Sequence, residues 1–158
     1  MTVTVEEILD RAVSEGYLTP AGAAEGPAHS AGFLRFGLLD GVSSPFGWSD
    51  PDSSGVVGPS ADALAVDLGT GGGIPGLVLA TLTTCRWVLV DRGERRGSFL
   101  RWAVRRLGLG DRVEVVVADA VEVGRGPLRG KARLVTARGF ALPGAHPSTR
   151  QPRGPQKF

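Results

Sequence analysis

The stretch DLGTGGGIPG, residues 67–76, decides the fold of this chain. Its first two residues end the apolar run ALAVDL at 63–68, and it leads into apolar residues with helical spacing at 74–82. Glycines in such a turn let the backbone bend tightly and approach a ligand with no Cβ in the way. In an open α/β sheet, ligands bind at the carboxyl ends of the strands. The stretch therefore predicts a ligand-binding loop between a buried strand and a helix.

The segments after this loop alternate between strand and helix patterns. Apolar runs predict a second buried strand at 86–91 and further strands at 113–119 and 132–137, and apolar residues at i, i+3, i+4 and i+7 predict a helix over 94–107. Strands that alternate with helices over short loops form a parallel sheet with right-handed crossovers. We therefore expect residues 63–140 to form one α/β core.

The N-terminal part of the chain has a different organisation. A capping-box spacing followed by apolar residues predicts a helix over 5–15. A second helix is expected within 26–39, with Pro27 near its first turn. Residues 1–40 would then form a helical segment. Residues 41–62, rich in Gly, Ser and Pro, are expected to form a flexible loop.

The net charge of +2 hides an uneven distribution. Residues 1–85 carry a net charge of −8, residues 86–138 carry +7, and residues 139–158 carry +3. A basic half of this kind favours a polyanionic partner such as RNA, although arginines can also coat a solvated helix. The tail at 141–158 contains four Pro and no acid, and we expect it to be disordered.

Several classes of protein are disfavoured by the sequence. The single Cys85 cannot form an internal disulfide, so nothing indicates an oxidising compartment. No apolar run is long enough to cross a membrane, and the acidic N-terminus lacks the basic region of a signal peptide. His29 and His146 stand outside any metal-ligand pattern, so no metal is expected. The expected location is the cytoplasm.

Two kinds of ligand fit the glycine pattern. Gly71-x-Gly73-x-x-Gly76 matches the fingerprint of dinucleotide-binding proteins, which would bind NAD. Asp67-x-Gly69-x-Gly71-x-Gly73 resembles the first motif of class I S-adenosylmethionine-dependent methyltransferases. Asp67 favours the second ligand, because a carboxylate can offset a nearby ammonium or sulfonium charge but would repel a pyrophosphate.

Acids follow the next two predicted strands. Asp91 ends the strand at 86–91, where a carboxylate can accept both ribose hydroxyl protons of either cofactor. Asp119 and Ala120 end the strand at 113–119. In methyltransferases an Asp at that position often receives the adenine amino group. The alternative for both acids is a loop cap.

Longer segments resemble one family. DLGTGGGIPGLVLA at 67–80 closely resembles the first motif of the glucose-inhibited division protein B family, the small-subunit ribosomal RNA guanine-N7 methyltransferases. VLVDRGERRGSFLRWAVRRLGL at 88–109 and VTARGFA at 135–141 are similar to two later segments of that family. The resemblance covers about 63–142 and is looser in the N-terminal part. It implies a class I methyltransferase fold, a Rossmann-like parallel sheet preceded by N-terminal helices.

The resemblance also implies a cofactor, a partner and a set of site residues. S-adenosylmethionine would be the cofactor, and ribosomal RNA or the small ribosomal subunit would be the partner. The implied cofactor-binding residues are Asp67, Gly69, Thr70, Gly71, Gly72, Gly73, Asp91, Asp119 and Ala120. Arg95, Arg96 and Arg138 are the implied RNA contacts, with Arg138 beside the methyl-transfer site, and the alternative for all three is a solvated surface.

The sequence departs from the family towards its C-terminal end. The family's sheet has more strands than the four predicted here, and the composition changes abruptly near residue 141. We therefore expect a sheet that is incomplete at this end, through a fragment, a frameshift or a minimal variant completed by a partner. A chain of this kind would act as a methyltransferase or as a non-catalytic module that binds the cofactor or RNA.

Overall fold

The computed structural model of the chain describes residues 3–35, 48–49, 58–59 and 62–138. The predicted tail at 141–158 and most of the predicted loop at 41–62 therefore lie outside the described residues. The elements in chain order are α1 (Val5–Ser14), α2 (Pro20–Arg35), β1 (Trp48–Ser49), β2 (Gly58–Pro59), β3 (Leu64–Leu68), α3 (Gly76–Leu82), β4 (Arg86–Asp91), α4 (Glu94–Arg106), β5 (Val113–Val117), α5 (Ala120–Arg125) and β6 (Leu134–Ala137).

The four strands predicted in the core form one parallel sheet in the order β5-β4-β3-β6. From β3 the chain adds β4 and then β5 on one side, and it returns to the other side of β3 for β6. The direction of strand addition therefore reverses between β3 and β6. Doubly wound α/β folds bind their ligands at this switch point, outside the carboxyl ends of the strands.

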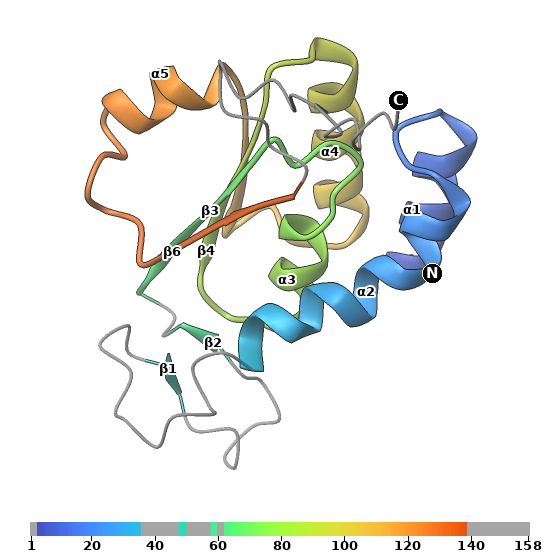
Figure 1. Cartoon of the computed structure of the whole chain (residues 1–158), viewed down its shortest axis with the longest axis horizontal. Coiled ribbons are helices and arrows are strands. Elements are labelled where there is room, and N and C mark those ends of the chain that lie inside the picture. The colour runs from blue at the N-terminus through green and yellow to red at the C-terminus, as the bar shows by residue number, and fades with distance from the viewer. Residues whose placement is uncertain (1–2, 36–47, 50–57, 60–61, 139–158) are drawn as a thin grey trace, which may run out of the picture.

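Helices cover both faces of the sheet. Figure 1 shows α1 to α4 on one side of the sheet and α5 on the other. Trp87 and Leu89 of β4 belong to the core cluster under α1, α3 and α4, whereas Val88 and Val90 belong to a second cluster on the α5 side. Successive side chains of a strand point to opposite faces, so β4 is buried on both. This double burial explains why β3 and β4 appear in the sequence as nearly continuous apolar runs.

Helix α2 differs from the prediction. It begins at Pro20, before the predicted range of 26–39, and Pro27 lies inside it instead of in its first turn. The hydroxyl of Thr19 accepts a hydrogen bond from the Gly22 backbone N–H at 3.0 Å, as an N-cap residue does. Thr19 followed by Pro20 is thus a helix start with proline in the first position. This cap, and not the later proline, sets the beginning of the helix.

Two short features were absent from the sequence prediction. Within the predicted loop, Trp48 and Ser49 pair with Pro59 and Gly58 as a minimal antiparallel ribbon, so this loop contains some regular structure. After β5, the carboxylate of Asp119 accepts a hydrogen bond from the Val121 N–H at 2.8 Å and caps α5. Both features are too short to produce a hydrophobic period that the sequence could reveal.

Candidate functional site

The glycine loop, residues 69–75, connects the carboxyl end of β3 to α3 at the switch point. Its first two backbone N–H groups, those of Gly69 and Thr70, donate to the carbonyl of Val90 on β4 at 2.9 and 3.0 Å. Gly69, Gly71 and Gly73 have φ angles of +69°, +57° and +104°. L-residues with a side chain rarely adopt these angles, so glycine is required for the shape of the loop.

The glycine loop presents only part of its backbone to the surface. Gly69 is exposed and Gly71 is half-buried, whereas Thr70, Gly72 and Gly73 are buried. A Cβ on Gly72 would lie 2.5 Å from Cγ of Leu18, which packs against the loop from the turn after α1. The loop thus has a surface formed by Gly69 and Gly71 and an inner side that packs against the N-terminal helices.

Asp67 lies beneath the loop and is completely buried. Its Oδ2 atom accepts hydrogen bonds from the Thr70 hydroxyl and from the Gly76 N–H, the latter at 3.0 Å. Its Oδ1 atom accepts one from the Thr136 hydroxyl of β6 at 2.7 Å. One side chain therefore joins the end of β3, the loop, the start of α3 and the neighbouring strand β6.

Burial sets the protonation of Asp67. It raises the pKa of the carboxyl group from 3.8 to about 6, and the hydrogen bonds from Thr70, Thr136 and Gly76 offset only part of this effect. The charge of Asp67 is thus shared among three donors within the protein. Asp67 thus joins the loop to its neighbours and has no exposed surface in this structure.

Asp91 stands at the end of β4 beside the glycine loop, and it is 5% exposed. Its Oδ2 atom accepts a hydrogen bond from the Gly71 N–H at 3.0 Å. Its Oδ1 atom accepts from the Gly93 N–H and from Nε of Arg96, both at 2.8 Å. The structure therefore brings together three residues that the sequence singled out separately, Gly71, Asp91 and Arg96.

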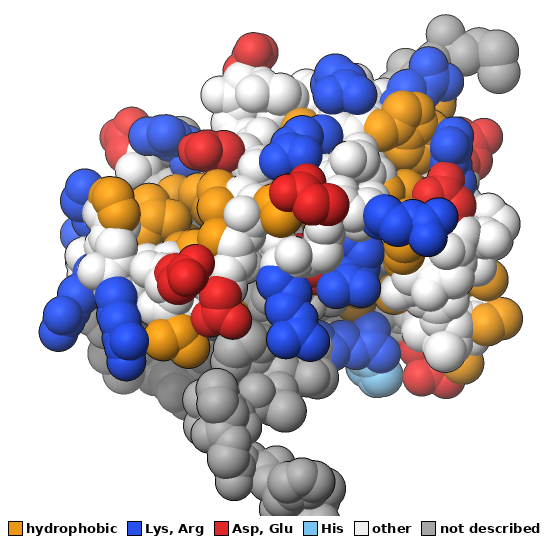
Figure 2. All heavy atoms as spheres, turned by 90° about the horizontal axis from the view of Figure 1, so that it is seen from above, with side chains coloured by type: hydrophobic (Ala, Val, Ile, Leu, Met, Phe, Trp, Pro, Cys, Tyr) orange, Lys and Arg blue, Asp and Glu red, His pale blue; other side chains and the backbone are white. Residues whose placement is uncertain are grey.

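The remaining predicted residues lie on the surface around this centre. Asp119, with its carboxylate in the cap of α5, and half-buried Ala120 follow β5. Arg138 is exposed directly after β6, and Arg95 is exposed in the first turn of α4. The strands of the main sheet run upwards in Figure 1, so Figure 2 looks onto their carboxyl ends and shows exposed basic side chains interleaved with acidic and hydrophobic ones.

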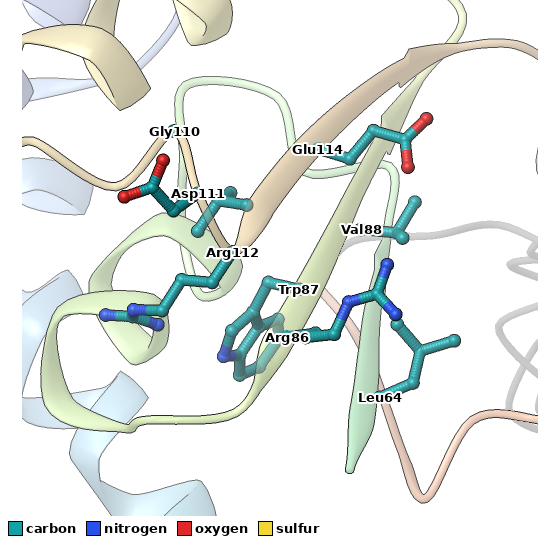
Figure 3. A pocket seen from close by; sticks show the side chains of 9 residues that line it. Leu64, Arg86, Trp87, Val88, Gly110, Asp111, Arg112 and Glu114 are labelled. Carbon is teal, nitrogen blue, oxygen red and sulfur yellow. The ribbon is translucent and has the colours of Figure 1, made fainter. Parts of the chain in front are cut away.

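A hollow of about 190 Å³ lies at the opposite end of the sheet, by the amino ends of β3, β4 and β5. Figure 3 shows Arg86 on β4 and Glu114 on β5 beside it. Arg112 lies in the same wall, directly before β5. It donates to the backbone carbonyls of Cys85 and Ala80 and so joins the start of β5 to α3 and to the residue before β4. None of the residues predicted for the site lines this hollow.

Among residues 3–35, 48–49, 58–59 and 62–138, no three side chains of His, Cys, Asp or Glu are grouped so that they could hold a metal ion. In the same residues, no helix has both the length and the apolar character needed to cross a membrane.

Sequence reasoning missed Thr136 and Leu18 as parts of the site. Thr136 reaches Asp67 across 69 positions of sequence, and Leu18 reaches Gly72 from the N-terminal helices. Thr136 does fall within the family-like segment at 135–141, which was a usable indication. Leu18 carries no local pattern, because its role depends on how the N-terminal helices pack on the loop.

The chain was compared with known families, proteins and structures. Residues 54–145 match the family described as rRNA small subunit methyltransferase G, GidB. Proteins named ribosomal RNA small subunit methyltransferase G from Cereibacter sphaeroides and Salinispora arenicola are 41% and 46% identical over 81 and 85 residues, which cover 48% and 50% of this chain. These regions are 36% and 34% of the two relatives, so the chain spans about a third of their length.

A solved structure supports the fold independently. The Methanococcus maripaludis protein, proposed to be an S-adenosyl-L-methionine-dependent methyltransferase, aligns with a TM-score of 0.54 and 17% identity, covering 85% of this chain and 49% of its own. At this identity the likeness confirms the predicted methyltransferase-like α/β fold alone. The family match includes the glycine loop, Asp91 and β6, and it extends over more than half of the chain. The chain therefore belongs to the GidB family of rRNA small subunit methyltransferases G.

Proposed function

We propose that this chain binds S-adenosylmethionine at the carboxyl ends of β3 and β4, as part of an enzyme that methylates N7 of a guanine in small-subunit ribosomal RNA. One observation carries the proposal. The N–H of Gly71, in a left-handed turn at the surface, donates to Asp91 Oδ2, so a side-chain-free backbone and a carboxylate stand together at the switch point. Membership of the GidB family supports ribosomal RNA as the substrate.

The predicted cofactor-binding residues divide into two groups. Gly69 and Gly71 offer backbone at the surface, and Asp91 offers a carboxylate for the ribose hydroxyls. The other predicted residues act from behind the loop surface, because their side chains or Cα positions are buried; these are Asp67, Thr70, Gly72 and Gly73. We assign this second group to shaping the loop, and the first group to direct contact.

Asp91 has limited capacity for new hydrogen bonds. A carboxylate offers about four lone-pair sites, and three protein donors already use Asp91. One ribose hydroxyl fits the remaining site on Oδ2. The second hydroxyl requires Arg96 to leave Oδ1, because the two backbone donors are fixed by the loop and the start of α4. Cofactor binding is therefore proposed to exchange the Arg96 contact for a ribose contact.

Methyl transfer to guanine N7 requires alignment of the methyl donor with the base and requires no general base. S-adenosylmethionine supplies an electrophilic methyl group on a sulfonium. Guanine N7 has an in-plane lone pair and no proton, so this chain needs no residue to remove one. Its residues act by holding the two reactants in line. We propose that Asp119 and Ala120 border the adenine and that Arg138 lies by the RNA, whose target base must be accessible in single-stranded or splayed RNA.

Calorimetric titration of the full chain with S-adenosylmethionine and with NAD tests the cofactor. We expect binding of S-adenosylmethionine and none of NAD. The Gly71→Val variant, which adds a branched side chain where φ is +57°, should lose this binding. Binding of NAD without binding of S-adenosylmethionine would refute the proposal and favour an oxidoreductase.

Transfer of a tritiated methyl group to small ribosomal subunits and to free ribosomal RNA tests the reaction. We expect label in the RNA, at N7 of guanine. A chain that binds S-adenosylmethionine but transfers no methyl to either substrate would be a non-catalytic cofactor-binding module. That result would remove the enzymatic part of the proposal and leave the cofactor site in place.

A further inference from the structure

A second hollow, of about 390 Å³, opens between the end of α1 and the outer face of α4. Three aromatic side chains form its floor. The rings of Tyr17 and Phe99 are 5.2 Å apart between centroids, and those of Phe99 and Trp102 are 5.8 Å apart. Phe99 is buried, whereas Tyr17 and Trp102 are only half-buried. We call this site the aromatic hollow.

Arginines border the aromatic hollow on both helices. The guanidinium of Arg11 lies over the Trp102 ring, 4.0 Å from its centroid. Its Nε atom donates to Glu15 at 2.7 Å, so the one acidic side chain in the lining is already paired. Arg95 is exposed at the other wall, and within the described residues it forms no salt bridge. Because Arg11 and Glu15 offset each other, Arg95 gives the lining of the hollow its net positive charge.

The aromatic hollow adjoins the glycine loop. Tyr17 is followed by Leu18, whose side chain packs against Gly72 of that loop. On α4 the neighbouring residues Arg95 and Arg96 divide between the two sites: Arg96 contacts Asp91, and Arg95 lines the aromatic hollow. A ligand in the hollow would thus lie next to the candidate cofactor site.

From this arrangement we infer that the aromatic hollow binds one nucleotide of single-stranded RNA, with the base against Tyr17 and Trp102 and the phosphate against Arg95. The inference rests on the proposed function, in which RNA is the substrate, and adds a binding site away from the methylated base. One face of Trp102 is covered by the flat guanidinium of Arg11, and a base that stacks against this ring takes the place of that guanidinium. Bases stack on aromatic rings and on guanidinium planes in the same way.

Fluorescence anisotropy with a labelled oligouridylate of about twelve nucleotides tests the inference on the full chain. We expect Trp102→Leu to weaken binding about tenfold, because a stacking contact is lost, and Trp102→Tyr to retain most of the affinity. Ser98→Glu places a carboxylate in the hollow from an exposed position and should weaken binding several-fold without disturbing the core. Unchanged affinity in Ser98→Glu would overturn the inference even if the Trp102 variants failed to fold.

A matched pair of arginine variants separates the hollow from general electrostatic attraction. Arg95→Gln should weaken binding several-fold and reduce the dependence of log K on log salt concentration by about 0.7. Arg101→Gln removes the same charge from an exposed site on the same helix, outside the hollow, and should have a smaller effect. Equal losses in the two variants would overturn the inference. Tighter binding of polyglutamate than of oligouridylate would also overturn it, and would indicate an acidic protein partner.

Titration with S-adenosylmethionine distinguishes a failure of this inference from a failure of the proposed function. All variants in the aromatic hollow should bind the cofactor as the unmodified chain does. If the unmodified chain failed to bind the cofactor but showed the expected RNA pattern, the proposed function would fail and the hollow would stand. Normal cofactor binding together with unchanged RNA affinity in every hollow variant would overturn the inference alone.

Discussion

The glycine loop and the aromatic hollow lie against the same turn of the chain, yet they are built in opposite ways. Around the loop, the ionisable groups Asp67 and Asp91 are buried, and every oxygen accepts a hydrogen bond from the protein. In the hollow, the charged groups Arg11 and Arg95 are exposed. A change in the loop should therefore alter the stability of the fold, whereas a change of an exposed side chain in the hollow, such as Arg95 or Ser98, should alter binding alone.

The largest expected effect comes from Gly76→Ala. An added Cβ would lie 2.5 Å from Asp67 Oδ2 and 2.7 Å from Cδ2 of Leu89, inside the core. Relieving both contacts requires a shift of β3 or α3, and we expect the free energy of unfolding to fall by about 3 kcal/mol. Urea denaturation followed by circular dichroism measures this change.

Gly124→Ala provides the matched control for this substitution. Gly124 lies in α5, and its added Cβ would meet no atom within 4 Å. Alanine is favoured over glycine in helices, so the free energy of unfolding should stay equal or rise by up to about 1 kcal/mol. Equal destabilisation by both substitutions would show that the loop region is not packed as tightly as the comparison requires.

The pH dependence of stability gives the next largest effect. Burial raises the pKa of Asp67 to about 6 in the folded chain, above its ordinary 3.8. The folded chain then holds this proton more tightly than the unfolded chain does. The contribution of Asp67 to the free energy of unfolding should therefore fall by up to about 3 kcal/mol between pH 4 and pH 6, and stay constant above that range.

Asp67→Asn isolates this contribution, because the amide keeps a carbonyl acceptor but does not titrate. The difference in free energy of unfolding between the two proteins, measured from pH 4 to pH 7.5, should change in this window. A difference that is constant with pH would contradict the burial of an ionisable Asp67. The same pH series on Arg95→Gln should run parallel to that of the unmodified chain, since Arg95 is exposed.

Gly71→Ala should produce a smaller loss of stability together with a loss of cofactor binding. Its φ of +57° costs alanine about 1 kcal/mol, and its nearest neighbour would be the Gly69 carbonyl at 3.8 Å. Gly130→Ala, at a φ of +71° with no atom within 4 Å, carries a similar strain far from the loop in sequence. Both should be destabilised alike in urea, but only Gly71→Ala should weaken S-adenosylmethionine binding in calorimetry. Equal affinities in the two variants would remove Gly71 from the contact surface.

The sequence predicted the core of this fold because that core depends on local patterns. The runs at 63–68 and 86–91 are mostly apolar, since both faces of the strands are covered, and the glycine loop has glycines where left-handed angles are needed. Both features can be recognised in a few consecutive residues of the sequence. They were sufficient to place four parallel strands and to point to Asp67 and Asp91.

The sequence could not predict which partner each of these side chains contacts. Asp67 was expected to meet the charge of a cofactor, but its neighbour Thr136 comes from a strand 69 positions away and encloses it. The sequence predicts Arg96 as an RNA contact or a solvated side chain, and it does not reveal that the guanidinium pairs with Asp91. The helix pattern does not single out Trp102, because its contact with Arg11 depends on how α1 packs on α4.

The smallest expected effect concerns Arg96, the cation that pairs with Asp91 beside the loop. Its side chain is 39% exposed, so its ion pair with Asp91 should contribute less than about 1 kcal/mol, and Arg96→Gln should unfold in urea almost as the unmodified chain does. Because the substitution frees an acceptor site on Asp91 Oδ1 for a ribose hydroxyl, affinity for S-adenosylmethionine should rise about threefold. Arg95→Gln removes the same charge one residue away, does not touch Asp91, and should leave that affinity unchanged. If Arg96→Gln instead weakened cofactor binding, Arg96 would orient Asp91 for the ribose, and the loop, like the hollow, would depend on an exposed arginine.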